Sequence, residues 1–208
     1  MKLVVFGATG SVGRKLVEQA LEAGHEVTAF ARTPAKLALD DPNLRLVQGD
    51  VLDYAAVKEA VRGQEAVLCA LGAGRKGTVR AVGTRHIVQA MEEEPSRPRL
   101  VCQTTLGVGD SRDNLNFFWK HIMFGMLLAP AYADHVRQEE YIKKSRLDWT
   151  IVRPGAFTDG ERTGSYRHGF GPKDRSTCLK ISRADVADFM LKQVADPIYR
   201  HRTPGLSY

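Results

Sequence analysis

The chain has few cysteines and no long hydrophobic run. Its 208 residues include three cysteines, Cys69, Cys102 and Cys178, an odd number at scattered positions. This set does not match a disulfide framework, and no Cys/His cluster has the spacing of metal ligands. No apolar stretch reaches about 18 residues, so the sequence predicts no transmembrane helix. We therefore expect a cytoplasmic protein with reduced thiols, no metal and no membrane partner.

Interleaved basic and aromatic residues, which would indicate nucleic-acid binding, are also missing. Thirty Lys and Arg against 24 Asp and Glu give a net charge of +6, which suits either a solvated surface or one that attracts anions. Arg75, Lys76, Arg80 and Arg85 come together after a predicted strand. This grouping favours a small-molecule substrate with a phosphate or carboxylate group over nucleic acid.

Strand-like and helix-like segments alternate along the chain with little between them. Apolar runs such as residues 3–6 suit strands that are covered on both faces. The alternation predicts an α/β fold, a Rossmann-type doubly wound parallel sheet with helices on both faces, in a single domain over residues 1–208. The predicted strands are 2–6, 26–31, 44–48, 66–70, 99–104 and 149–153, and the predicted helices are 11–23, 54–61, 79–93, 133–145 and 183–195.

Two segments interrupt the alternation. Residues 115–128 are unusually apolar and predict either a lid over the substrate pocket or a dimer surface, so a monomer or a weak homodimer is expected. Residues 158–177 are rich in Gly, Arg and Asp and predict a long loop at the substrate end. We expect the substrate pocket to form between residues 105–135 and 154–180.

A glycine motif follows the first predicted strand. Gly7 permits a tight turn, Gly10 lets the backbone approach a pyrophosphate, and Gly13 lets the next helix pack close to the strand. The helix would then offer unpaired N–H groups to the phosphates. A glycine turn without a ligand is the alternative, but the position between strand and helix favours a dinucleotide.

The end of the second predicted strand indicates which dinucleotide is bound. NAD enzymes usually carry an acid there to hold the ribose hydroxyls, whereas here the strand ends at Arg32. A guanidinium pairs with a 2′-phosphate through two parallel hydrogen bonds. The sequence therefore predicts NADP(H), with a solvated arginine as the alternative.

Residues after the third and fourth predicted strands suit the rest of that cofactor. Asp50 can accept a hydrogen bond from the adenine amino group while Val51 lines the ring, and Asp53 is placed to cap the next helix. Leu71 and Gly72 offer a bare backbone edge where the ribose would pass.

Together these motifs resemble the atypical short-chain dehydrogenase/reductase superfamily, within it the biliverdin reductase B/flavin reductase group. The resemblance is carried by residues 7–13, Arg32, residues 49–53 and residues 181–187. It implies that NADPH delivers hydride to a flat conjugated acceptor such as a flavin or a linear tetrapyrrole. It also implies that the hydroxyl of Thr105 and the imidazole of His135 lie beside the nicotinamide.

A catalytic Tyr-x-x-x-Lys pair is not placed for this reaction. Its one copy begins at Tyr54, on the adenine side, while Tyr132 and Tyr141 have no lysine four residues on. Reduction of a flavin or bilin needs less from the protein, because the cofactor supplies hydride and solvent can supply the proton. A non-enzymatic NmrA-like NADP sensor fits the missing pair as well, and a nucleotide-sugar epimerase or dehydratase fits it least.

Two candidate residues have structural alternatives. His135 could hydrogen-bond a backbone carbonyl, and the Thr105 hydroxyl could hydrogen-bond a backbone group at the end of its strand. The aromatic residues that could stack a flat substrate, or else close the core, are Phe117, Phe118, Trp119 and Phe124. The predicted catalytic residues are Thr105 and His135, and the predicted cofactor-binding residues are Gly7, Ala8, Thr9, Gly10, Ser11, Val12, Arg32, Asp50, Val51, Leu71, Gly72, Arg80, Pro154 and Ala156.

Overall fold

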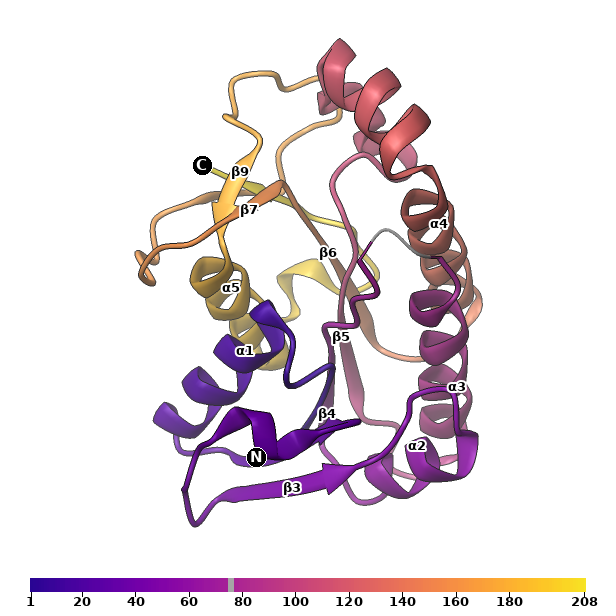
Figure 1. Cartoon of the computed structure of the whole chain (residues 1–208), viewed down its shortest axis with the longest axis vertical. Helices are drawn as coiled ribbons and strands as arrows, with labels where there is room; N and C mark the ends of the chain where they lie inside the picture. Colours follow the sequence, from indigo (N-terminus) through magenta and orange to yellow (C-terminus); the bar gives the residue numbers. More distant parts are fainter. Residues whose placement is uncertain (75–76) are drawn as a thin grey trace.

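The centre of the molecule is an eight-stranded, mostly parallel sheet (Figure 1). The computed structural model describes residues 1–74 and 77–208. The strand order is β3-β2-β1-β4-β5-β6-β10-β8, with β8 antiparallel to β10, and β7 and β9 form a separate parallel pair. The strands are β1 (Lys2–Phe6), β2 (Glu26–Ala31), β3 (Leu44–Gln48), β4 (Ala66–Cys69), β5 (Arg99–Gln103), β6 (Trp149–Pro154), β7 (Ala156–Thr158), β8 (Arg167–His168), β9 (Lys180–Ser182) and β10 (Gly205–Ser207).

Helices cover both faces of this sheet. In Figure 1, α1 and α5 lie on one side and α2, α3 and α4 on the other. This is the predicted single-domain Rossmann-type arrangement. The α-helices are α1 (Ser11–Glu22), α2 (Tyr54–Val61), α3 (Val79–Glu93), α4 (Ala129–Lys144) and α5 (Arg183–Ala195), and the shorter or irregular helices are η1 (Pro34–Leu37), η2 (Gly109–Asn114), η3 (Phe118–Leu127) and η4 (Pro197–Tyr199).

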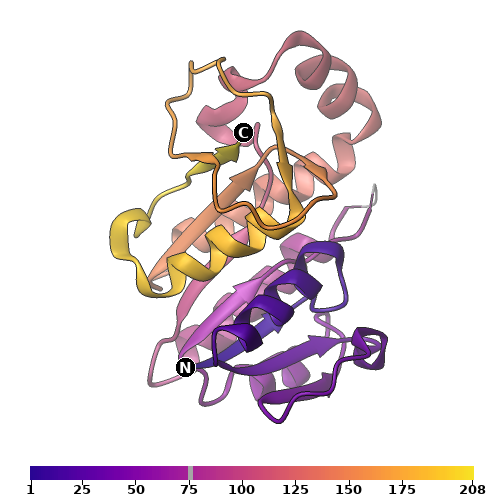
Figure 2. The same cartoon turned by 90° about the vertical axis from the view of Figure 1, so that its left-hand side faces the viewer.

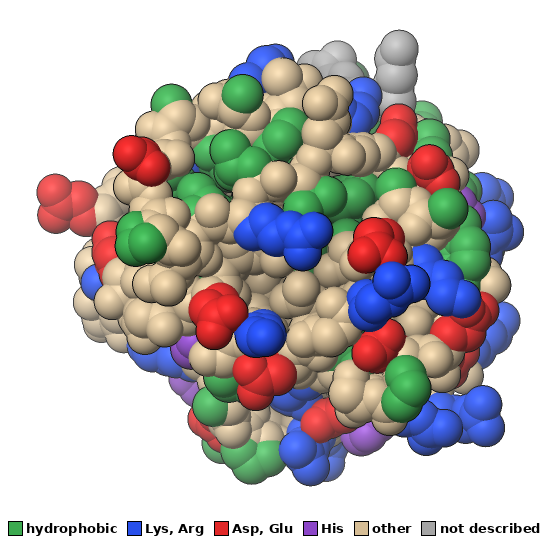
Figure 3. Space-filling model, turned by 90° about the horizontal axis from the view of Figure 1, so that it is seen from below, with side chains coloured by type: hydrophobic (Ala, Val, Ile, Leu, Met, Phe, Trp, Pro, Cys, Tyr) green, Lys and Arg blue, Asp and Glu red, His purple; other side chains and the backbone are tan. Residues whose placement is uncertain are grey.

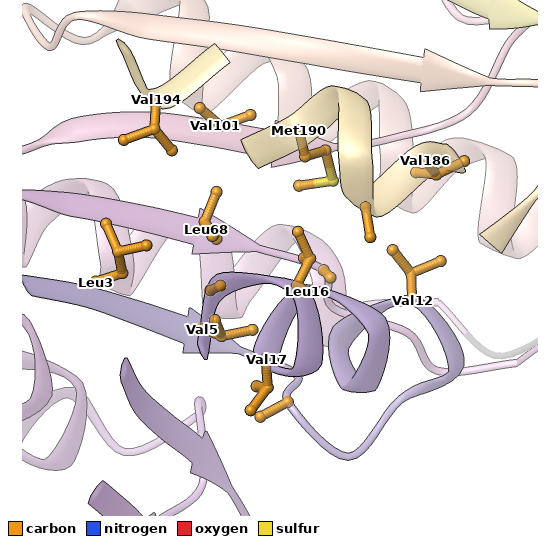
Figure 4. Close-up of a cluster of buried hydrophobic side chains, with 14 of the residues drawn as sticks. Leu3, Val5, Val12, Leu16, Val17, Leu68, Val101, Val186, Met190 and Val194 are labelled. Atoms are coloured by element: carbon orange, nitrogen blue, oxygen red, sulfur yellow. The ribbon is translucent and has the colours of Figure 1, made fainter. Parts of the chain in front are cut away.

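Alternating strand residues build a separate core on each face. Leu3 and Val5 of β1 pack toward α1 and α5, whereas Val4 and Phe6 join the core under α2, α3 and α4. Figure 4 shows the first of these cores. Because both faces are covered, the two strands at the centre, β1 and β4, are apolar over residues 3–6 and 66–69, as predicted.

Most predicted elements are confirmed, and the differences are local. Asp53 caps α2 by accepting hydrogen bonds from two backbone amides, and Ser182 caps α5 by accepting one from Asp185 N. Helix α4 begins at Ala129, four residues before its predicted start, because Pro130 suits the first turn of a helix. The sequence analysis missed strands β7 to β10, which span two or three residues each and are too short to show a periodic pattern.

Residues 115–128 form a wide helix instead of a regular one. Its hydrogen bonding is of the π type over Phe118–Leu127, a geometry that recurs at functional sites. In Figure 2 the segment is part of the end of the molecule farthest from β3. Across the described ranges 1–74 and 77–208, the helices are all too short or too polar to cross a membrane.

The net positive charge does not gather in one patch on the face seen in Figure 3. Basic and acidic side chains lie next to one another there. Several pairs on the surface are in contact, for example Arg62 with Glu59 and Lys58 with Glu93.

Candidate active site

A cavity of about 990 Å³ opens at the carboxyl ends of the parallel strands. This is the edge of a doubly wound sheet at which ligands bind. Its walls come from the loops after β1, β2, β3, β4, β5 and β6, together with parts of η3, α4 and α5. The structure brings all of the predicted site residues to this cavity except Ala8.

Ala8 lies in the core instead of the cavity. Its side chain is fully buried and packs with Val12 and Leu16 of α1. The prediction that it contacts the cofactor was made from its place inside the glycine motif, and the structure assigns it to helix packing.

The glycine loop is shaped by close backbone approaches. A Cβ on Gly13 would lie 2.1 Å from the carbonyl oxygen of Gly7, so the helix can pack here only with glycine. Gly7 has a φ of +80°, and a Cβ on it would lie 2.5 Å from Ala70 O. A Cβ on Gly10 would meet Gly7 O at 3.1 Å and is otherwise nearly unobstructed by protein.

The start of α1 is left open for a ligand. Gly10 is the N-cap residue and supplies no side-chain cap, and the first turn holds no acid. Thr9, Gly10, Ser11 and Val12 all line the cavity. An uncapped helix start with glycine at the approach fits the phosphates of a dinucleotide.

Arg32 lies at the mouth of the cavity, at the end of β2. It is exposed and lines the cavity, and it has no hydrogen-bond or ion-pair partner within the described ranges. Both edges of its guanidinium are therefore available to an anion such as a 2′-phosphate.

The neighbouring strand ends form a slot suited to a flat ring. Val51 and Leu71 are buried and line the cavity beside Gly72. Asp50 is exposed, and one of its oxygens accepts a hydrogen bond from Leu52 N at 3.0 Å. The other carboxylate oxygen remains for a ligand.

Arg80 lines the cavity but is engaged by the protein. It is buried, its guanidinium lies 3.5 Å from the Asp134 carboxylate, and it donates a hydrogen bond to Gly74 O. Asp134 also accepts hydrogen bonds at 3.0 Å from the backbone amides of Arg80 and Ala81, and so caps α3 from a different helix. Of the other residues in the predicted basic group, Arg75 and Lys76 lie outside the described residues, and Arg85 is exposed and is not part of the cavity lining.

The opposite end of the cavity is apolar and aromatic. Trp119 and Phe124 line it, whereas Phe117 and Phe118 are 72% and 50% exposed and point away from the core, contrary to the predicted stacking role. Thr105 is half-buried, and its hydroxyl is 3.4 Å from Leu106 O. The lining residues of this end include Leu106, Leu115, Trp119, Phe124, Leu128, Pro154, Gly155, Ala156, Phe157, Leu179 and Arg183.

The long loop predicted over residues 158–177 contributes less than expected. It contains the short strand β8, and its residues are outside the cavity lining. Asp185 of α5 binds this loop by accepting hydrogen bonds from the backbone amides of Thr163 and Gly164. The loop therefore packs against α5, and Phe157 and Leu179 on either side of it reach the cavity.

His135 lies in the cavity wall and is neutral near pH 7. Burial, together with the nearby Arg80 guanidinium, lowers the pKa of His135 to about 4. Gln138 donates through Nε2 to Thr84 Oγ1, so its oxygen faces His135 Nδ1 at 3.0 Å. This network assigns the proton to Nδ1 and leaves Nε2 as an acceptor. The structure thus supports contact with a ligand but not proton donation by an imidazolium.

A buried ion pair joins β6 to α4 next to Thr104, which lines the cavity. Arg153 of β6 binds Glu139 of α4 through Nε and Nη2 at 2.9 and 2.7 Å, and both side chains are almost fully buried. Thr104 donates to the same carboxylate at 2.9 Å, and Arg153 also pairs with Asp110. Burial alone would raise the pKa of Glu139, but Arg153 and Lys143 hold it below its ordinary value. This network joins the loop after β5 to α4.

Comparison with known proteins agrees with this geometry. A family model described as NAD(P)H-binding matches residues 7–197. The chain belongs to this NAD(P)H-binding family. A chloroplastic, uncharacterized protein of Arabidopsis thaliana, At2g34460, is 30% identical over 230 residues, which cover 100% of this chain and 80% of the relative.

Solved structures of similar proteins show the same fold. ChuY of Escherichia coli O157:H7, described as an anaerobillin reductase, has a TM-score of 0.81 at 25% identity and covers 100% of this chain and 97% of its own. A short-chain dehydrogenase/reductase of Veillonella parvula in complex with NADP has a TM-score of 0.82 at 16% identity, with 100% and 94% coverage. The second likeness concerns the fold alone.

Sequence reasoning missed several residues that line this cavity, among them Gln103, Phe157 and Arg183. Gln103 and Phe157 belong to no motif, whereas Arg183 lies in the segment 181–187 but was given no role there. The signal for Gln103 was a polar residue near the carboxyl end of a predicted buried strand, residues 99–104. Arg183 could have been found as the first residue after the N-cap of a helix whose start faces the carboxyl ends of the strands.

Alanine substitutions at Gly13 and Gly10 are expected to have different effects, the first on stability and the second on cofactor binding. Gly13→Ala should lower the free energy of unfolding by about 1–3 kcal/mol, because its Cβ collides with the Gly7 backbone. Gly10→Ala should leave stability within about 0.5 kcal/mol but weaken NADP⁺ binding roughly tenfold by displacing the phosphates from the backbone. Urea unfolding and calorimetric titration measure the two effects, and a stable Gly13→Ala protein would contradict the packing argument.

His135 is expected to make stability depend on pH. Between pH 6.5 and 4 the unfolded chain binds a proton at this histidine that the folded protein does not bind. The free energy of unfolding should therefore fall as pH drops through this interval, by about 3 kcal/mol in total, and be insensitive to His135 above pH 6.5. Urea titrations of the wild type and His135→Gln measure this difference, with the exposed His121→Gln as control. Parallel curves for wild type and His135→Gln would refute the assignment.

Proposed function

We propose that this protein is an NADPH-dependent reductase that delivers hydride to a flat conjugated acceptor, a flavin or a biliverdin-like tetrapyrrole. The observation that carries this proposal is a single cavity with a dinucleotide-type glycine loop and Arg32 at one end and Trp119 and Phe124 at the other. A likeness to an anaerobillin reductase supports a bilin-like acceptor. The predicted cytoplasmic location accords with two buried free thiols, Cys69 and Cys102.

The residues present fit NADPH. The glycine loop and the open start of α1 would hold the pyrophosphate, and Arg32 would hold the 2′-phosphate in preference to NADH. Val51 and Leu71 would flank the adenine, with Asp50 on its amino group. When bound, the cofactor supplies a hydride at the nicotinamide ring.

The side chains around the acceptor position it and contribute little acid–base chemistry. None of the lining residues in the described ranges is a tyrosine or a lysine, and His135 is neutral. The Tyr54–Lys58 pair is on α2, where Lys58 binds Glu93. Trp119 and Phe124 would exclude water from one side of the acceptor, and the Thr105 hydroxyl would orient its edge. The proton would come from solvent, which suffices for a flavin or bilin.

The test is NADPH oxidation by the purified protein against FMN, riboflavin, biliverdin and a quinone, with NADH in parallel. We expect turnover with NADPH on a flavin or on biliverdin, and slower turnover with NADH. Absence of turnover on every acceptor, with NADPH bound, would refute the reductase proposal.

The second candidate is a non-enzymatic NADP sensor that signals through a partner protein. A specific observation favours it: Phe117, Phe118, Met126 and Leu127 of the wide helix segment expose their side chains to solvent. Saturable NADPH binding without turnover, and a partner interaction that depends on NADPH, would establish this function in place of the first.

A further inference from the structure

Two residues of the cavity wall carry a buried polar atom without a hydrogen-bond partner in residues 1–74 and 77–208. These atoms are Oε1 of Gln103 and Nε of Arg183. Gln103 is the more enclosed residue, at 7% exposed. Its amide nitrogen has no protein partner in those ranges either. An amide left unpaired in a folded protein costs stability, so a bound ligand is the natural partner.

The strand pattern places Gln103 on the α1 side of the sheet. Val101, two residues earlier on β5, belongs to the core under α1 and α5, and Figure 4 shows it beside Met190 and Val194 of α5. Thr104, the next residue, donates a hydrogen bond to α4 on the opposite face. Gln103 therefore shares a face with the helix whose open start faces the cavity.

The strand order places Gln103 at the nicotinamide half of the cofactor. Arg32 and Asp50 follow β2 and β3, on one side of β1, and suit the adenosine end. A dinucleotide crosses the sheet edge at β1, and its second half lies over the strands on the other side. Gln103 ends β5, two strands from β1 in that direction.

We propose that the side-chain amide of Gln103 binds the carboxamide group of the nicotinamide ring. An amide presents one N–H edge and one carbonyl oxygen, and a carboxamide offers the complementary pair. The Nε–H of Arg183 is a second donor in the same wall. The contact fixes the rotation of the ring and so decides which face of it meets the acceptor. This inference rests on the proposed binding of NADP(H).

The test compares three ligands by calorimetric titration of the wild type and Gln103→Leu. NADP⁺ carries the carboxamide, its 3-acetylpyridine analogue keeps the carbonyl but lacks the N–H, and 2′-phospho-ADP-ribose lacks the ring altogether. The variant should bind NADP⁺ about tenfold more weakly and 2′-phospho-ADP-ribose unchanged. The wild type should prefer NADP⁺ to the acetylpyridine analogue, and the variant should lose that preference.

The control is Gln193→Leu, which changes a buried glutamine of α5 outside the cavity and should bind all three ligands like the wild type. If Gln103→Leu binds NADP⁺ as tightly as the wild type, the inference is overturned. This also holds if the substitution raises the KM for the acceptor. Should Gln103→Leu not fold, equal affinity of the wild type for NADP⁺ and the acetylpyridine analogue would overturn it. A wild type that binds 2′-phospho-ADP-ribose but shows no turnover would refute the reductase proposal and leave the carboxamide contact standing.

Discussion

Replacing Glu139 by alanine is expected to lower the free energy of unfolding by about 3–5 kcal/mol. The substitution leaves the Arg153 guanidinium, which is 1% exposed, without its buried counter-ion. The hydrogen bond from Thr104 is lost as well. For a domain of this size the midpoint of thermal unfolding should fall by roughly 10 °C. Urea titration followed by circular dichroism measures the change.

The matched comparison is an ion pair on the surface. Glu59→Ala breaks the contact between Glu59 and Arg62, and the side chains of both residues are more than half exposed. This substitution should lower the free energy of unfolding by less than about 1 kcal/mol. The double substitution Glu139→Leu/Arg153→Met should recover much of the loss, because it removes both buried charges. If Glu139→Ala were as mild as Glu59→Ala, the buried Arg153–Glu139 network would not contribute to the stability of the fold.

Replacing Arg32 by alanine is expected to raise the Kd for NADPH roughly 30-fold. The estimate corresponds to about 2 kcal/mol for hydrogen bonds between a guanidinium and a phosphate. Affinity for NADH, which lacks the 2′-phosphate, should change less than about twofold. Quenching of protein fluorescence on titration with each cofactor measures both constants.

Arg45→Ala provides the control for overall charge. Arg45 is exposed on the adjacent strand β3 and is not part of the cavity wall. Arg45→Ala lowers the net charge by one, as Arg32→Ala does. Any general electrostatic attraction of NADPH therefore falls by the same amount in both variants. Equal effects of the two substitutions would argue against a specific 2′-phosphate contact at Arg32.

The central fold could be predicted because its signals are local and repeated. Apolar runs such as residues 3–6 mark strands buried on both faces, and Asp53 and Ser182 mark helix starts by the hydrogen bonds they accept. The strand pairs β7–β9 and β8–β10 could not be predicted in this way. Their two or three residues are held by partners distant in sequence, as Ala156 pairs with Lys180.

The glycine-loop end of the cavity was predictable for the same reason, and the apolar end was not. The spacing of Gly7 and Gly13 predicts a tight turn and a close helix–strand contact. In the structure, neighbouring backbone atoms leave no room for a Cβ at either position. The engagement of Arg80 by Asp134, in contrast, depends on how α3 meets α4. The neutrality of His135 depends on its burial among side chains of other elements, which no motif encodes.

The cap that Asp134 supplies to α3 also bears on how the chain folds. Thr78, just before this helix, makes no side-chain cap, and the oxygens that bind Arg80 N and Ala81 N come from 54 and 53 positions further along the chain. The first turn of α3 therefore gains its stability only after the ends of a long segment have been brought together, at an entropic cost. The cap at the amino end of this helix is therefore a non-local contact, and the part of the cavity wall that α3 forms depends on the packing of α4 against it.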